Sequence, residues 1–434
     1  MRTPLEVWGG VECTCNRVGD RYLDQMAFSG HDSRRGDFDA IAELGIRRLR
    51  YGLLWERHET DPSWQWCDRQ MEDMATAGID PIVGLVHHGS GPSHTGLLDP
   101  AFPEKLAAYA GEVASRYPQI GAYTPVNEPN TTARFSGLYG IWYPHHLSRQ
   151  SYLRALLVQL RATVLSMHAI RLVRADAQFI QTEDVGCIWS TPQLESLRDL
   201  LEERRWLCFD LLCGLVTRHH PLYEYLLDAG ISDREILWFG ENPCPPNTIG
   251  INYYLTSDRY LDHRIDQYPA ERRSAEGPLV DVEAVRIRPG GIAGFGALLH
   301  EAWERYRIPV AITEVHLGCE DVYEQIRWAA EAWQSAESAS LAGVECQAVT
   351  FWALLGSYFW STLCCRNNGH YEPGVFDVRD GHLAPTELAE FLKQLASEGV
   401  ARHPALRQQG WWRRPSRLLF ANPQESGERE QLCR

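Results

Sequence analysis

The feature of this 434-residue sequence that most limits its fold is an alternation of short β-prone runs with longer helical segments, repeated eight times. The runs are apolar throughout, which is typical of strands buried on both faces of a parallel sheet. They lie at residues 5–10, 45–55, 81–88, 120–127, 177–184, 248–255, 309–316 and 348–355. The pattern predicts an α/β protein with a single (β/α)8 TIM barrel over residues 1–400. An open doubly wound sheet is the alternative, but no GxGxxG sequence follows an early strand.

Two segments depart from this pattern. Residues 262–290 are polar and irregular, so we expect a long loop between the sixth strand and its helix. Long loops at that face of a barrel usually border the active site. Residues 401–434 are rich in Arg, Pro and Gln and predict an irregular C-terminal extension. Within it we expect the WWRRP sequence to pack on the barrel and the last dozen residues to be disordered.

Composition narrows the possible partners and location. A net charge of −15 argues against a nucleic-acid partner and favours a neutral or cationic small molecule. The N-terminus does not resemble a secretory signal, and no stretch predicts a membrane span. The 12 cysteines are scattered and form no CxxC, which predicts reduced thiols in a cytoplasmic protein; a zinc site is a minor alternative. We expect neither a metal nor an organic cofactor, and the oligomeric state is not predicted.

Polar and titratable side chains gather at the carboxyl ends of the predicted strands, where barrel enzymes place their active sites. They are Arg50, His87, His88, Asn127, Glu128, Glu183, Asp184, Asn252, Tyr254 and Glu314, with Trp352, Tyr358, Phe359 and Trp360 after the eighth strand. Two carboxylates among aromatic and amide groups suit the hydrolysis of an acetal, which needs one acid and one carboxylate. Glu183 and Asp184 more often cap a loop or pair with an arginine than contact a substrate. Adjacent histidines such as His87 and His88 point in different directions and chelate a metal poorly.

Five motifs in order along the chain resemble those of family 1 glycoside hydrolases, the β-glucosidase-like clan with catalytic glutamates on strands four and seven. They are RYGLLW at 50–55, VNEPN at 126–130, GINYY at 250–254, ITEVH at 312–316 and FWALLGSYFW at 351–360. The resemblance runs from about residue 5 to residue 397, and this order makes it far more specific than any one motif alone. It implies a TIM barrel and a retaining glycosidase.

The resemblance also implies roles for individual residues. Glu314 would be the nucleophile that attacks the anomeric carbon, with Arg50 and Tyr254 stabilising its carboxylate. Glu128 would be the acid/base that protonates the departing oxygen and then activates water. Its pKa should fall once the charge of Glu314 is consumed, so that one residue serves both steps.

The same comparison implies a sugar-binding set. Asn127 would bind the 2-hydroxyl, His87 another ring hydroxyl, and Trp352 would form the platform under the sugar. Asn252 and Trp360 complete this set together with two positions that depart from the family pattern. Those are Asn16, where the family has a first-strand glutamine, and Phe359, where it has a glutamate that holds the 4- and 6-hydroxyls.

The departures affect the expected specificity. A phenyl ring at position 359 cannot accept hydroxyl hydrogen bonds, so we expect a less polar sugar edge, as in a deoxy sugar, a pentose or a substituted sugar. Val315 also replaces the family's asparagine after the nucleophile. We therefore expect a retaining O-glycosidase acting on a small β-linked glycoside or glycoconjugate. A transglycosidase with the same residues, or a catalytically weak barrel that binds carbohydrate or a partner protein, are the alternatives.

Overall fold

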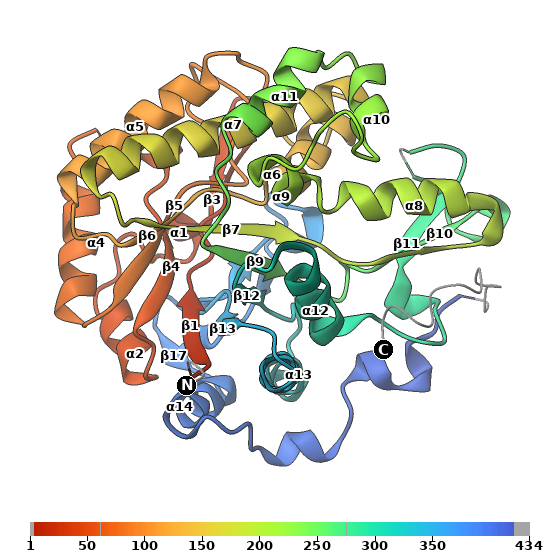
Figure 1. Ribbon diagram of the computed structural model, residues 1–434. Helices are drawn as coiled ribbons and strands as arrows, with labels where there is room; N and C mark the ends of the chain where they lie inside the picture. The colour runs from red at the N-terminus through yellow and green to blue at the C-terminus, as the bar shows by residue number, and fades with distance from the viewer. Residues whose placement is uncertain (1–3, 61, 275, 421–434) are drawn as a thin grey trace.

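The computed structural model describes residues 4–60, 62–274 and 276–420 and contains a closed barrel of eight parallel strands (Figure 1). Each strand pairs with the next around the barrel in the order β1-β13-β12-β9-β7-β6-β5-β4, and the barrel closes between β4 and β1. The strands are β1 (Glu6–Gly10), β4 (Arg48–Gly52), β5 (Asp80–His87), β6 (Ala122–Asn127), β7 (Gln178–Asp184), β9 (Thr248–Asn252), β12 (Val310–Val315) and β13 (Cys346–Phe351). All eight coincide with predicted runs, so the predicted TIM barrel is confirmed.

The strands are apolar on both sides because the barrel has two hydrophobic layers. Inside it, Trp8, Ile82, Ile180 and smaller alanine side chains from other strands form a closed cluster. Outside it, a much larger cluster fills the space between strands and helices. Because both faces of each strand are buried, the sequence shows no alternation of polar and apolar residues.

The helices surround the barrel (Figure 1). They are α1 (Gln25–Phe28), α2 (Asp37–Glu43), α3 (Trp55–Thr60), α4 (Gln65–Thr76), α5 (Phe102–Arg116), α6 (Pro129–Ala133), α7 (Arg149–Val173), α8 (Glu195–Arg204), α9 (Leu207–Leu212), α10 (Tyr223–Asp228), α11 (Asp233–Glu241), α12 (Gly294–Tyr306), α13 (Val322–Leu341) and α14 (Glu387–Glu398). In the described ranges, α7 alone is long and apolar enough to cross a membrane, with a mean hydropathy of 1.4 in its most apolar stretch. It packs along α5, and 56% of that stretch is buried in the protein, as in the core helix of a globular fold.

The predicted loop at 262–290 is more regular than its sequence suggests. Its β11 (Val280–Glu283) pairs with β10 (Arg259–Asp262), which also pairs with β8 (Ile188–Ser190). The expectation of an irregular loop is therefore wrong in part, since a small sheet forms from segments far apart in the chain. The expectation that this segment borders the central cavity is confirmed, because Arg272, Asp281 and Glu283 line it.

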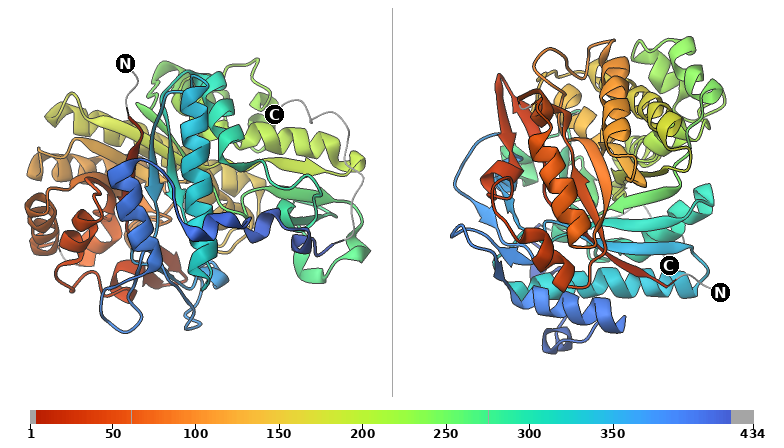
Figure 2. Two further views of the ribbon diagram at one scale, coloured as in Figure 1. Left: turned by 90° about the horizontal axis from the view of Figure 1, so that it is seen from below. Right: turned by 90° about the vertical axis from the view of Figure 1, so that its left-hand side faces the viewer.

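The C-terminal extension packs on the barrel as far as it is described. After α14 the chain crosses α13 and reaches the sheet of β8, β10 and β11 (Figure 2, left). Trp412 is buried edge-to-face against Trp328 of α13, with ring centroids 5.0 Å apart. Arg417 donates hydrogen bonds to three backbone carbonyls between Val285 and Pro289. The last dozen residues, for which disorder is expected, lie outside the described residues.

Candidate active site

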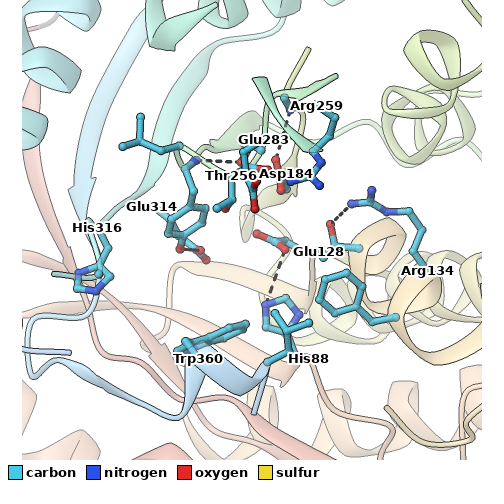
Figure 3. Close-up of a pocket in the computed structure, with 18 of the residues that line it drawn as sticks. His88, Glu128, Arg134, Asp184, Thr256, Arg259, Glu283, Glu314, His316 and Trp360 are labelled. Atoms are coloured by element: carbon cyan, nitrogen blue, oxygen red, sulfur yellow. Dashed lines mark hydrogen bonds and ion pairs between the residues drawn. The ribbon is translucent and has the colours of Figure 1, made fainter. Parts of the chain in front are cut away.

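One large cavity opens at the carboxyl ends of the barrel strands, with a volume of about 810 Å³. Glu128 and Glu314 both line it, and Figure 3 shows their side chains pointing into it from different strands. His88 and Trp360 line the same end of the cavity (Figure 3). The two predicted catalytic glutamates are thus brought together in one enclosed site.

Glu314 lies near the end of β12 and has both carboxylate oxygens occupied. The Arg50 guanidinium on β4 donates to Oε1 at 2.9 Å, and the Tyr254 hydroxyl donates to Oε2 at 2.6 Å. Arg50 also donates to the Thr313 carbonyl and to Asn127 Oδ1, both at 2.7 Å. Arg50 and Glu314 are both buried, so their ion pair is shielded from water. The predicted stabilisers of Glu314 therefore contact it directly.

Glu128 follows β6 at the point where the chain turns into α6. Its φ of 45° is left-handed, and the Pro129 that follows begins the helix. Asn252, at the end of β9, donates from its side chain to Glu128 Oε1 at 2.6 Å. His88 Nε2 lies 3.7 Å from Oε2. No arginine or lysine of the described residues forms an ion pair with Glu128, in contrast to Glu314.

The electrostatic environments of the two glutamates therefore differ. Burial and the nearby Glu314 raise the pKa of Glu128 well above its usual range. Burial also raises the pKa of Glu314, but Arg50 and Tyr254 oppose that rise. Burial lowers the pKa of His88 to about 3, so the imidazole beside Glu128 is neutral. A single negative charge shared by the pair is thus best placed on Glu314, and the proton on Glu128.

The predicted sugar-binding residues divide into two groups. His87, Tyr254, Trp352 and Trp360 line the cavity, and the rings of His87 and Trp352 are stacked 5.1 Å apart. The other group, Arg50, Asn127 and Asn252, lies behind the cavity wall and holds the lining residues in place.

Asn127 shows how completely this second group is hydrogen-bonded. Its Oδ1 accepts from Arg50 and from Thr182, and its Nδ2 lies 3.2 Å from His87 Nε2 and 3.4 Å from His88 Nε2. These contacts connect the two histidines to Arg50. The predicted contact of Asn127 with the 2-hydroxyl stays a prediction.

Two further predicted positions neither line the cavity nor contact its lining glutamates, and these are corrections. Asn16 is fully buried in β2 (Cys15–Val18), where its side chain donates to the Cys364 carbonyl at 2.9 Å. Phe359 is 2% exposed and packs edge-to-face on Phe28, with ring centroids 4.8 Å apart. Its φ of 63° is left-handed. Neither residue lines the cavity, so the specificity inferred from a phenyl ring at 359 loses its basis.

A carboxylate that was not among the predicted site residues also lines the cavity. Glu12 follows β1 by two residues and is buried next to Trp352 and Trp360. The criterion that identified the other residues, a titratable group just after a barrel strand, also applies to Glu12. It was missed because the titratable groups considered began at the second strand.

The adjacent residues Glu183 and Asp184 lie in different surroundings. Glu183 caps the start of α6 by accepting from the backbone N–H groups of Asn130 and Thr131, as expected for a structural residue. Asp184 lines the cavity. In the described ranges, no group of three or more His, Cys, Asp or Glu side chains is placed to hold a metal ion.

Comparisons with known proteins place this site in a wider context. No protein-family model matches the chain. β-Glucosidase 47 of Arabidopsis thaliana is 23% identical over 459 residues, covering 94% of this chain and 82% of that protein. A 6-phospho-β-glucosidase of Dickeya chrysanthemi is also 23% identical, over 74% of this chain and 72% of that protein.

Solved structures share the fold over most of the chain. A family 1 glycoside hydrolase from Thermotoga maritima, complexed with a cyclophellitol analogue, superposes with a TM-score of 0.74 at 16% identity, covering 91% of this chain and 98% of that one. A Thermotoga maritima β-glucosidase in complex with deoxynojirimycin gives a TM-score of 0.71 at 17% identity, over 85% and 87% of the two chains. The resemblance that the motifs predict is confirmed: the chain is similar in sequence to β-glucosidases and shares its fold with a family 1 glycoside hydrolase.

Proposed function

We propose that this chain hydrolyses a small β-linked O-glycoside with retention of configuration at the anomeric carbon. The observation that carries the proposal is that two buried glutamates in one cavity have different charged and hydrogen-bonding partners. Glu314 is paired with Arg50 and Tyr254, and Glu128 has only neutral partners. The names of the relatives, β-glucosidase and 6-phospho-β-glucosidase, support the same reaction class.

In the first half of the reaction, an ionised Glu314 attacks the anomeric carbon while the bond to the departing oxygen breaks. Glu128 gives its proton to that oxygen, so the aglycone leaves as a neutral alcohol. Arg50 stabilises the charge of the Glu314 carboxylate, and Tyr254 orients it toward the sugar through the hydrogen bond to Oε2. The product of this step is a glycosyl ester on Glu314.

In the second half, Glu128 acts as a base. Once Glu314 is esterified its negative charge is gone, and one of the causes that raise the pKa of Glu128 disappears with it. The ionised Glu128 can then take a proton from water as the water oxygen attacks the anomeric carbon. The ester bond breaks, and Glu314 returns as a carboxylate.

The test is intact-mass analysis after incubation with 2-deoxy-2-fluoro β-glycosides that carry good leaving groups. We would use gluco, galacto, fuco, xylo and arabino forms. A mass gain that maps to the peptide containing Glu314 is the expected result, and Glu314→Gln serves as the matched control that should not be labelled. If no member labels the wild-type protein and none is turned over, the proposed function is wrong.

The role of Glu128 needs its own variant. Glu128→Ala should turn over glycosides slowly, because the base for the second step is missing. Azide needs no base and should restore turnover of a substrate with a good leaving group, giving a β-glycosyl azide. An α-glycosyl azide would instead indicate direct displacement without a glycosyl-enzyme, and would contradict retention.

A cytoplasmic location is a further part of this proposal. Cys13, Cys208 and Cys346 are free thiols buried in the protein, as expected in a reducing compartment. Cell fractionation with antibody detection would test this location, and recovery with an exported fraction would contradict it.

A further inference from the structure

Glu12 places a carboxylate at the end of the cavity formed by the two lining tryptophans. Trp352 Nε1 and Trp360 Nε1 both donate to Glu12 Oε2, at 3.2 and 3.1 Å. The backbone N–H of Thr14 donates to Oε1 at 2.8 Å. Glu12 is 4% exposed and lines the cavity, so its carboxylate is both oriented and able to meet a bound molecule.

The position of Trp352 makes this arrangement possible. Gly10, at the end of β1, lies under its ring, and a Cβ at that position would come within 2.2 Å of Trp352 Cε3. The close approach lets the indole lie across β1 with its N–H directed at Glu12. Two other side chains also hold the Trp352 ring in place. The Arg50 guanidinium lies 4.7 Å from the ring centre, and the His87 ring stacks on it.

The hydrogen-bonding capacity of Glu12 is not exhausted by these contacts. An ionised carboxylate has about four acceptor positions, and three N–H groups account for three of them. An indole has only a donor, so the two tryptophans cannot bind hydroxyl groups as acceptors. Glu12 therefore has capacity to accept from a sugar hydroxyl, beside two aromatic faces that suit the ring.

The charges near Glu12 also discriminate between ligands. The Arg50 guanidinium is already engaged by Glu314 and Asn127. Burial and the neighbouring His88 lower the pKa of His87, and burial lowers that of His88 to about 3, so both imidazoles are neutral. The carboxyl groups of Glu12 and Glu314 thus face this end of the cavity with no uncommitted cation among Arg50, His87 and His88, which disfavours an anionic group such as a phosphate.

We infer that Glu12 binds hydroxyl groups on the edge of the sugar that lies against Trp352 and Trp360, and selects a neutral, hydroxylated sugar over deoxy and phosphorylated forms. This inference rests on the proposed glycosidase function. It reverses the specificity expected from Phe359, because the carboxylate comes from the loop after the first barrel strand and not from position 359. Glu12 acts here as a binding residue, separate from the bond-breaking pair.

The experiment compares 4-nitrophenyl β-glycosides that differ at this edge. The glucoside is paired with the xyloside and the 4-deoxyglucoside, the galactoside with the fucoside, and the glucoside is also compared with its 6-phosphate. A hydrogen bond to a charged acceptor should make kcat/KM about 10- to 100-fold higher for the glycoside that carries the hydroxyl than for the one that lacks it. We expect the wild-type enzyme to show this preference in at least one pair, and to have a lower kcat/KM on the glucoside 6-phosphate than on the glucoside.

Glu12→Gln keeps the shape and one acceptor oxygen but removes the charge. It should reduce the hydroxyl preference to less than about threefold and improve the relative rate on the 6-phosphate. An equal loss on every substrate would show that Glu12 only holds the tryptophans, and would overturn the inference. Phe359→Leu is the matched control, and it should leave all the ratios unchanged.

The outcomes separate the two proposals. If the wild-type protein neither turns over nor is labelled by any glycoside, the glycosidase function fails. If it is active but treats each pair alike, or prefers the 6-phosphate, the role of Glu12 fails while the glycosidase function stands. The substrate ratios of the wild-type protein test the role of Glu12 without any variant. If Glu12→Gln does not fold, Glu12→Asp is the second substitution.

Discussion

Replacing Arg50 with methionine should shift the pH dependence of catalysis in a predictable direction. The guanidinium Nη1 lies 2.9 Å from Glu314 Oε1, and both side chains are buried. Glu314 must be ionised to attack and Glu128 protonated to donate, so Glu314 sets the acid limb of the kcat/KM profile and Glu128 the alkaline limb. Loss of the cation makes ionisation of Glu314 harder, and the acid limb moves to higher pH.

The size of the effect follows from the geometry. Two charges about 4 Å apart attract by about 4 kcal/mol at an effective dielectric constant of about 20. Losing an attraction of that size should raise the pKa of Glu314 and disfavour its ionised form by a factor of about 100 to 1,000. On the acid side of the optimum, kcat/KM should then fall by a factor of at least about 100.

The assay is kcat/KM against pH with an activated aryl glycoside, for wild-type protein, Arg50→Met and Arg50→Lys. Lysine keeps the charge but loses the forked geometry, so its acid limb should stay near the wild-type position while the overall rate falls. For Arg50→Met we expect a narrower bell, because the acid limb approaches the alkaline one. A uniform loss at every pH with an unmoved acid limb would refute the reasoning.

Three further predictions concern the site, the buried acids and the extension. Tyr254→Phe removes the 2.6 Å hydrogen bond to Glu314 and should lower kcat/KM by about 10- to 100-fold with little change in melting temperature, measured by steady-state kinetics and thermal unfolding. Burial raises the pKa of Glu56 to about 7, so the folded state binds a proton that the unfolded chain releases near pH 4.5. This contribution to stability is complete below pH 4.5 and is lost as the pH rises to about 7. Glu56→Gln should flatten that decline and stabilise the protein by about 3 kcal/mol at pH 8, and an unchanged melting curve would contradict the assignment. Trp412→Ala should cost about 3 kcal/mol of unfolding free energy, because it empties a buried site against Trp328; a cost below about 1 kcal/mol in denaturant titration would mean that the extension packs loosely.

The sequence alone was sufficient to predict the barrel and to propose Glu128 and Glu314 as the catalytic pair. Strands buried on both faces require continuous apolar runs, so each of the eight was visible without tertiary information. The rule that barrel active sites lie where strands end placed Glu128 and Glu314 among the candidates, and the family resemblance of their motifs singled them out. Their partners Asn252 and Tyr254 lie at or just after the end of β9, whereas Arg50 lies within β4. Closure of the sheet brings these strands to one site.

Only the tertiary structure decided which side chains reach the end of the cavity that Trp352 and Trp360 line. The left-handed backbone at Phe359 and its contact with Phe28 turn that ring away, and neither is visible in a local pattern. Glu12 reaches the cavity because Gly10 lets Trp352 lie across the first strand, a contact between residues more than three hundred positions apart. Sequence periodicity determines which face of an element is buried, but the direction of a single side chain after a strand depends on what packs against it.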